Sequence, residues 1–331
     1  VVMDVHTGEV LSLVSKPSFD PNAFNRGLSR AEWNKLISNP RTPLNNKAIA
    51  GQYAPGSTFK MIVALAALEK GVVSPRRRFF CNGEMELGNA TFHCWKKNGH
   101  GAMDMVSAIA QSCDVYFYEI ARKTGIDRIA SMARRFGMGQ YLDAGLPGEK
   151  RGLIPTRAWK RKAKGTSWQQ GETVLAGIGQ GFILTTPLQL AVMMSRLVNG
   201  GRAVRPSLTR QIISHSEDVS QISVSSDFQK IGLHPTHLNV VTRAMTAVTN
   251  SPTGTAFRAR IKDGKRAMGG KTGTVQVRRI SKAERETGVL KNEDLEWHER
   301  DHAVFVGFAP VETPRYAVSV VVEHGGSGSS S

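Results

Sequence analysis

Strand-like segments occupy the two ends of this 331-residue chain, and helix-like segments fill the middle. At the start, β-branched runs at residues 1–5 and 9–14 flank a His-Thr-Gly turn, which predicts a β-hairpin. Later in the chain, the same kind of pattern predicts strands at residues 208–214, 267–277, 303–309 and 316–322. If the last strands pair with the opening hairpin, they form an antiparallel sheet of about five strands flanked by helices, an α+β fold.

The middle of the chain carries apolar residues at helical spacing. Residues 57–70 predict a helix that stops at Gly71. Further helices are expected at residues 105–111, 115–123, 126–136, 187–199 and 236–250. Residues 15–56 indicate a long irregular segment, and residues 278–301 a charged insertion that we expect to be mobile. The longest apolar runs are strand-sized and too short to cross a bilayer.

The charge balance is strongly basic, with 44 Lys and Arg against 27 Asp and Glu and a formal net charge of +17. Such a balance suggests a polyanionic neighbour, which could be nucleic acid, an anionic membrane surface or an acidic polymer. The basic residues are dispersed, and none of the patterns typical of nucleic-acid-binding modules accompanies them. We therefore expect no nucleic-acid partner.

Two short motifs place a serine beside a charged residue near an expected helix. Ser57 and Lys60 are three residues apart, which puts them on one face of a helical turn. A serine with a neutral lysine beside it can act as a nucleophile, although most serines before helices are simply caps. Ser112 and Asp114 follow the expected helix at 105–111, and this motif alone also indicates only a cap.

A third motif, Lys271-Thr272-Gly273-Thr274, lies inside a predicted strand. Glycines in a strand often mark a place where a ligand or another backbone comes close. Taken in order, S-x-x-K, S-x-D and K-T-G resemble the signature of penicillin-binding proteins and serine β-lactamases. The three motifs together are far more specific than any one of them.

Three further segments resemble the class B penicillin-binding proteins: residues 53–60, 177–181 and 302–310. Within that family, residues 4–10, 20–22 and 92–101 make the chain look most like the elongation-type subgroup. The resemblance implies one transpeptidase domain over residues 1–326 and a flexible Gly/Ser tail at 327–331. It further implies that an N-terminal membrane anchor and pedestal are missing from the chain, so that both ends read as fragment boundaries.

The resemblance implies that the chain is a serine-type DD-transpeptidase that needs no catalytic cofactor. Ser57 would attack the D-Ala-D-Ala carbonyl of a stem peptide or a β-lactam, and Lys60 would be its general base. Ser112 and Asp114 would complete the proton network around Lys60 and the leaving amine.

The third motif would bind the substrate. Lys271 and Thr272 would hold its terminal carboxylate, while Gly273 leaves room for it along the strand edge. The N–H groups of Ser57 and Thr274 would form the oxyanion hole.

The family context implies a bacterial inner-membrane protein with its catalytic domain in the periplasm. It implies partners in the elongation machinery, namely a RodA-like lipid II polymerase and MreC, and contact with the membrane through the missing anchor. A serine β-lactamase, a DD-carboxypeptidase and a β-lactam-sensing or scaffold module are the alternative functions. A β-lactamase needs a base that activates water, and we find no clear equivalent in the sequence.

The three cysteines of the chain are Cys81, Cys94 and Cys113, and His100 lies between the last two. Residues 82–91 predict a β-hairpin that would bring the first two cysteines together near Ser112. Thiolates and an imidazole in a set of four suit tetrahedral zinc, and the elongation-type subgroup resembles this arrangement. A structural zinc site is the leading interpretation, with a Cys81–Cys94 disulfide or three unrelated thiols as alternatives. His93 is a less favoured ligand, because His100 sits in a Gly-His-Gly turn that can reach inward.

Overall fold

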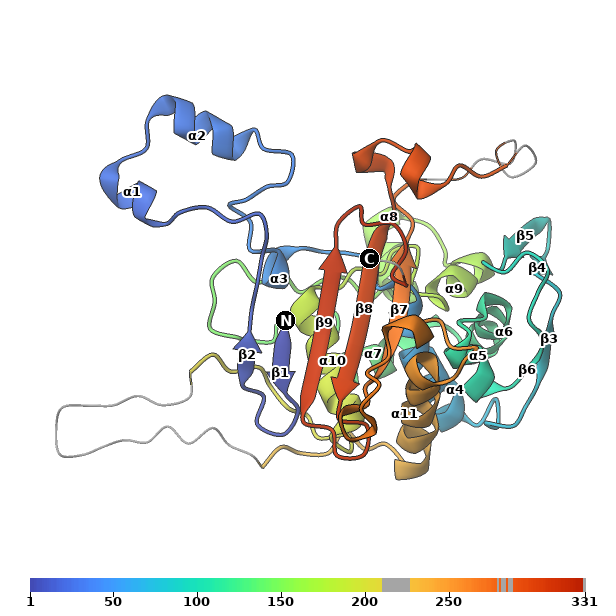
Figure 1. The fold of residues 1–331 in the computed structure, drawn as a ribbon. Coiled ribbons are helices and arrows are strands. Elements are labelled where there is room, and N and C mark those ends of the chain that lie inside the picture. The colour runs from blue at the N-terminus through green and yellow to red at the C-terminus, as the bar shows by residue number, and fades with distance from the viewer. Residues whose placement is uncertain (210–226, 279, 281–283, 285–287, 330–331) are drawn as a thin grey trace.

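The computed structural model describes residues 1–209, 227–278, 280, 284 and 288–329. Its centre is a five-stranded sheet in the order β2-β1-β9-β8-β7, in which every pairing is antiparallel (Figure 1). The strands are β1 Val2–Asp4, β2 Val10–Ser12, β7 Gly269–Val275, β8 His302–Ala309 and β9 Tyr316–Val322. The two ends of the chain therefore meet in one sheet, which confirms the expected α+β fold.

All six expected helices are present, and five of them begin and end within one residue of the expected bounds. They are α4 Lys60–Lys70, α5 Met105–Ala110, α6 Asp114–Thr124, α7 Ile126–Arg135, α10 Pro187–Val198 and α11 Pro235–Asn250. One difference matters for the site. The expected helix at 57–70 begins as a 3₁₀ turn, η1 Gly56–Phe59, and becomes an α-helix only at Lys60.

Several short helices were not expected from the sequence. The segment 15–56, predicted to be irregular, contains α1 Asn22–Arg26, α2 Arg30–Ile37 and α3 Lys47–Ala50, and α2 starts at a capping box formed by Ser29 and Glu32. That prediction was wrong because a capping box stabilises even a short polar helix. The others are α8 Arg157–Lys164, α9 Gln170–Ala176, η2 Phe257–Ala259 and η3 Gly264–Arg266.

Two expectations fall partly on residues that the structure does not describe. Residues 210–214 of the strand expected at 208–214 lie outside the described part of the chain. So do seven residues of the insertion at 278–301, whose described part contains the short 3₁₀ helices η4 Asn292–Asp294 and η5 Trp297–Glu299.

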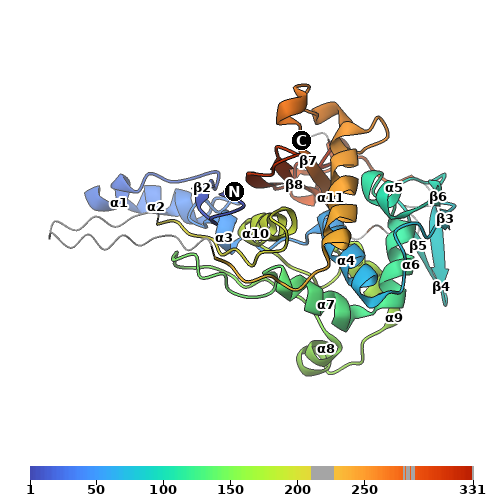
Figure 2. The ribbon, with the colours of Figure 1, turned by 90° about the horizontal axis from the view of Figure 1, so that it is seen from below.

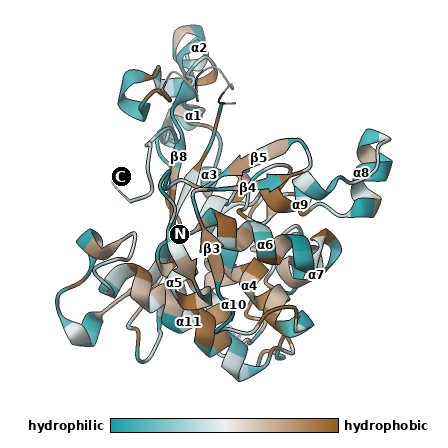
Figure 3. Ribbon diagram, turned by 90° about the vertical axis from the view of Figure 1, so that its right-hand side faces the viewer, coloured by the Kyte–Doolittle hydropathy of each residue, from teal (hydrophilic) through white to brown (hydrophobic). Residues whose placement is uncertain are grey.

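The hydrophobic core lies between the sheet and its helices. Helix α10 packs on β9 and β8, and α11 packs on β7, while α4 contacts α6, α7 and α11. Nine residues of α4, from Lys60 to Leu68, are buried. Hydrophobic colour accordingly marks α4 and α10, whereas α8 is hydrophilic (Figure 3).

A small lobe stands beside α5 and α6, away from the sheet (Figure 2). It consists of two short strand pairs, β3 Phe79–Cys81 with β6 Gly101–Met103, and β4 Glu84–Leu87 with β5 Ala90–His93. The second pair is the expected hairpin with its turn at residues 88–89. Among the described residues, we find no helix that is both long and apolar enough to span a membrane.

Candidate active site

Ser57 lies in the turn η1, which a glycine loop holds against the sheet. The residue at the cap position of η1 is Pro55, so Ser57 is not a helix cap. The N–H of Gly56 donates to the carbonyl of Gly179 at 3.0 Å. A Cβ on Gly179 would lie 2.1 Å from the carbonyl oxygen of Gly56, so only glycine permits this approach. The loop that contains Gly179 thus fixes the start of the first motif.

The structure brings the three motifs together around the hydroxyl of Ser112. Lys60 Nζ donates to Asp114 Oδ1 at 2.7 Å, to the Ser112 carbonyl at 2.8 Å and to Ser112 Oγ at 3.1 Å. Lys271 Nζ reaches the same Oγ from strand β7 at 2.9 Å. Ser112 Oγ then donates to Ser57 Oγ at 3.0 Å. Both lysine side chains are completely buried.

This network connects the lysines to Ser57 through a hydroxyl. Within the described residues, the hydrogen bond to Ser57 Oγ comes from Ser112, not directly from Lys60. When the hydroxyl hydrogens turn so that Ser57 donates to Ser112 and Ser112 donates to a neutral amine, Ser112 can relay the Ser57 proton to that amine. The geometry gives Ser112 a more central position than its motif alone indicated.

Burial shifts the pKa values of Lys271 and Asp114, the two ionisable groups next to Lys60. Burial, together with the nearby charge of Lys60, holds the pKa of Lys271 well below its usual range. Burial also raises the pKa of Asp114, although its ion pair with Lys60 opposes this effect. A lysine with a lowered pKa is an amine that can be neutral and accept a proton.

The K-T-G motif runs along β7 beside η1. Gly273 sits where a Cβ would be 3.1 Å from the carbonyl oxygen of Pro55, so the strand and the turn pack tightly. Thr272 is buried, and its hydroxyl lies 2.8 Å from that of Thr255. The Thr274 side chain is exposed, and its carbonyl accepts from Gln180 Nε2 at 3.3 Å. Sequence reasoning missed Thr255, which belongs to no local pattern, and gave no role to Gln180, although Gln180 lies in the family-like segment 177–181.

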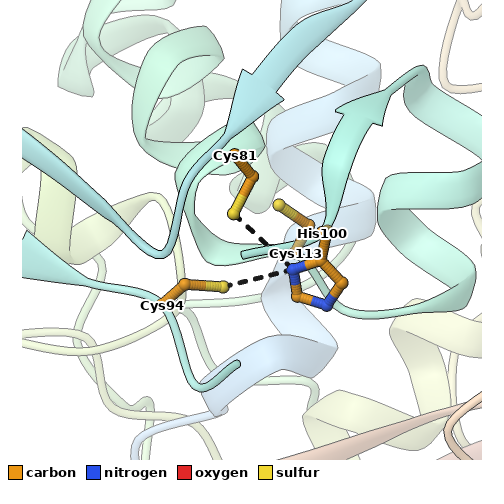
Figure 4. Close-up of side chains that lie close together, drawn as sticks. All are labelled: Cys81, Cys94, His100 and Cys113. Atoms are coloured by element: carbon orange, nitrogen blue, oxygen red, sulfur yellow. Dashed lines mark hydrogen bonds between the residues drawn. The ribbon is translucent and has the colours of Figure 1, made fainter. Parts of the chain in front are cut away.

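The Cys and His residues of the lobe form a compact set. One ligand atom from each of Cys81, Cys94, His100 and Cys113 lies within 4.8 Å of every other (Figure 4). His100 Nδ1 is 3.6 Å from Cys81 Sγ and 3.5 Å from Cys94 Sγ. All three cysteines are free, so the alternative disulfide is not formed in this structure.

The spacing of these atoms fits a tetrahedral ion. Zinc–sulfur and zinc–nitrogen bonds of ~2.3 and ~2.0 Å would separate sulfur from nitrogen by about 3.5 Å. The hydrogen bond from the Cys113 thiol strongly lowers the pKa of Cys94, which favours the thiolate form that zinc binds. By contrast, His93 points away from the set and pairs with Glu84 at 3.3 Å. The set is therefore the one predicted from the sequence, with His100 and without His93.

A nucleophilic serine linked through a second serine to two buried lysines defines a serine acyl-transfer site. The fold and this site place the chain in the class of penicillin-recognising serine proteins. The chain belongs to the penicillin-binding protein transpeptidase family, because the model of the penicillin-binding protein transpeptidase domain matches residues 1–331.

Similar proteins point to one branch of that family. The chain is 36% identical over 329 residues to the peptidoglycan D,D-transpeptidase MrdA of Salmonella typhimurium, covering 99% of this chain and 52% of that protein. It is 37% identical over 334 residues to MrdA of Acinetobacter baumannii, covering 100% of this chain and 48% of that protein. The chain thus spans about half the length of the curated relatives it matches.

Solved structures similar to this chain belong to the same branch of the family. The chain resembles PBP2 of Pseudomonas aeruginosa in complex with WCK 5153, with 39% identity, a TM-score of 0.86, and coverage of 99% of this chain and 67% of that one. It also resembles PBP2 of Helicobacter pylori in its complex with MreC, with 31% identity, a TM-score of 0.82, and coverage of 98% and 56%.

Proposed function

We propose that this chain is the catalytic domain of a peptidoglycan D,D-transpeptidase that cross-links stem peptides during cell elongation and is acylated by β-lactams. The observation that carries the proposal is the hydrogen-bond chain from Lys60 and Lys271 through Ser112 Oγ to Ser57 Oγ. The MrdA names of the relatives support the reaction, and the PBP2 structures support the branch.

The reaction follows from the positions of these groups. Ser57 Oγ attacks the carbonyl between the two D-Ala residues and forms an ester, while its proton passes through Ser112 to a lysine amine. Lys60 is our proposed base, which must be neutral when it accepts the proton, with Asp114 fixing its position. The proton then goes to the departing D-Ala nitrogen as the C–N bond breaks. An amine of a second stem peptide attacks the ester, forms the cross-link and frees Ser57.

Charge on the substrate and on the intermediate needs separate binding groups. We propose that Lys271 and Thr272 hold the terminal carboxylate of the substrate. The N–H groups of Ser57 and Thr274 would bind the developing oxyanion, and a donor aimed at such a charge typically accounts for ~10²- to 10³-fold in rate. Gly273, which we expected to leave room for the peptide along the strand edge, instead lets β7 pack against η1, because a Cβ on it would lie 3.1 Å from the Pro55 carbonyl oxygen.

The lifetime of the acyl-enzyme tests this proposal against its rivals. Fluorescent penicillin should label the chain and remain bound for hours, and a D-Ala-D-Ala peptide should exchange its last residue for an added amine. Ser57→Ala should abolish both signals, whereas Ser74→Ala, at an exposed serine, should change neither. Rapid release of hydrolysed penicillin would instead identify a β-lactamase. Release of D-Ala without amine transfer would identify a carboxypeptidase.

We also propose the cellular setting that the family resemblance implies. The domain would work in the periplasm, held at the inner membrane by an N-terminal anchor outside this chain. Its partners would be MreC, which the Helicobacter pylori PBP2 structure contains, and a RodA-like lipid II polymerase. The net charge of +17 fits work beside anionic lipids.

We also propose that the chain binds a structural zinc ion. Cys81, Cys94, His100 and Cys113 would hold it, and it would tie the lobe to the second motif through Cys113. Elemental analysis should find one zinc per chain, which His100→Ala should lose. His93→Ala, at the neighbouring exposed histidine, should keep it. Metal-free protein, or equal zinc in both variants, would contradict the site.

A further inference from the structure

Trp95 links the lobe directly to the second motif by three hydrogen bonds. Its backbone N–H donates to Asp114 Oδ2 at 2.9 Å. Its indole Nε1–H is shared between the carbonyls of Gln111 at 3.2 Å and Ser112 at 3.1 Å. The side chain is nevertheless 59% exposed. An exposed tryptophan whose two N–H groups both donate to residues 111–114 is not explained by core packing.

The carbonyl that the indole contacts belongs to a strained residue. Ser112 has a φ of +57°, in the left-handed region that a residue with a Cβ rarely adopts. Such a conformation persists only where the surrounding structure fixes it. The Ser112 carbonyl accepts one hydrogen bond from the Trp95 indole and another from Lys60 Nζ. These two donors together fix the orientation of the carbonyl.

The orientation of that peptide determines where the Ser112 hydroxyl lies. Ser112 Oγ must stay within hydrogen-bond distance of Ser57, Lys60 and Lys271 at once. Rotation about the N–Cα bond of Ser112 moves its Cβ and its carbonyl together, so a hydrogen bond to the carbonyl also restrains this hydroxyl. The backbone bond from Trp95 also holds the carboxylate of Asp114, which pairs with Lys60.

We propose that Trp95 is a positioning residue for acylation, which acts by holding the Ser112 peptide in its left-handed conformation through the indole N–H. This inference rests on the proposed function, because it assigns Trp95 a part in the acylation of Ser57. Trp95 follows the proposed zinc ligand Cys94 in the chain, so the lobe delivers the indole to the second motif. No pattern in the sequence singled it out.

Acylation kinetics with a β-lactam can separate this role from a structural one. Trp95→Phe keeps a ring but removes the N–H donor, and site-specific incorporation of benzothienylalanine replaces only the indole N–H with sulfur. Both should lower the first-order acylation constant by about five- to tenfold, as expected for the loss of one hydrogen bond. The apparent dissociation constant of the β-lactam, the unfolding temperature and the zinc content should stay as in the unaltered chain.

A matched control is available in the same lobe. Phe80 is 72% exposed on β3, and Phe80→Leu should leave acylation unchanged. Unaltered acylation in the benzothienylalanine protein would overturn the proposal, even if Trp95→Phe is slower, because the isostere preserves the packing. A failure of the unaltered chain to be acylated at all would overturn the proposed function instead.

Discussion

At the residue scale, the unusual feature of the site is that two completely buried lysines share one serine hydroxyl. Lys60 has a carboxylate partner in Asp114. Lys271 donates to Ser112 Oγ and to the carbonyl of Thr272 at 2.9 Å, and both acceptors are neutral. Burial makes the charged form of Lys271 costly and the charge of Lys60 repels it, which is why the pKa of Lys271 is lowered. The fold therefore makes the ammonium form of Lys271 less favourable than it is in water.

Lys271→Met should make the chain more stable and less active. Replacing a buried charged side chain with an apolar one of similar volume often stabilises a protein by about 1 to 3 kcal/mol. The acylation rate should fall by ~10²-fold or more. Because the folded-state pKa is lowered, the unfolded state binds more protons, and the unaltered chain gains stability as pH rises toward ~10.5. The stability difference should thus be largest near neutral pH and shrink by pH 10, as urea unfolding would measure. A variant that is less stable at pH 7 would contradict this account.

The candidate residues differ in how far the sequence predicts them. The order of three motifs was enough to single out Ser57, Lys60 and Lys271, because each motif is a short local pattern. Trp95 and Thr255 could not be predicted, since their hydrogen bonds cross to distant segments, and that of Trp95 also depends on the left-handed turn at Ser112. Local pattern identifies the groups that react, whereas the groups that hold them are set by tertiary packing.

At the scale of elements, the 3₁₀ turn η1 depends on the loop at residues 177–181. Helix spacing predicted the helix that follows Ser57, but the tighter turn before Lys60 arises from packing against Gly179 and β7. Gly179 and Gly181 offer a matched pair, since both have left-handed φ values of +71° and +78°. A Cβ on Gly179 would meet the Gly56 carbonyl oxygen at 2.1 Å, but the nearest atom to one on Gly181 is 3.8 Å away.

Gly179→Ala should therefore displace η1, whereas Gly181→Ala should only add backbone strain. We expect the first change to cost about 2 to 4 kcal/mol of unfolding free energy and to slow acylation of Ser57 at least tenfold. The second should cost about 1 kcal/mol and leave acylation nearly unchanged. Chemical denaturation and labelling kinetics on the two variants measure both effects. Equal acylation rates in the pair would rule out the loop as the support of the nucleophile.

At the scale of the whole molecule, the sheet explains how residues from both ends support one site. Strand β9 pairs with β1 on one side and β8 on the other, and β8 positions the K-T-G strand β7. The sequence predicted this arrangement because strand patterns occur at the ends of the chain. It could not predict α8 and α9, which are short and depend on contacts such as the pair between Lys160 and Glu172. The helices around α4 then close the core behind Ser57.

The central claim is that Ser57, activated through Ser112 and the two lysines, forms an acyl-enzyme. Mass spectrometry of the chain after incubation with penicillin G tests it most directly. The intact chain should gain the mass of one penicillin, and peptide mapping should place the adduct on Ser57. No adduct, or an adduct on any other residue, would contradict the account.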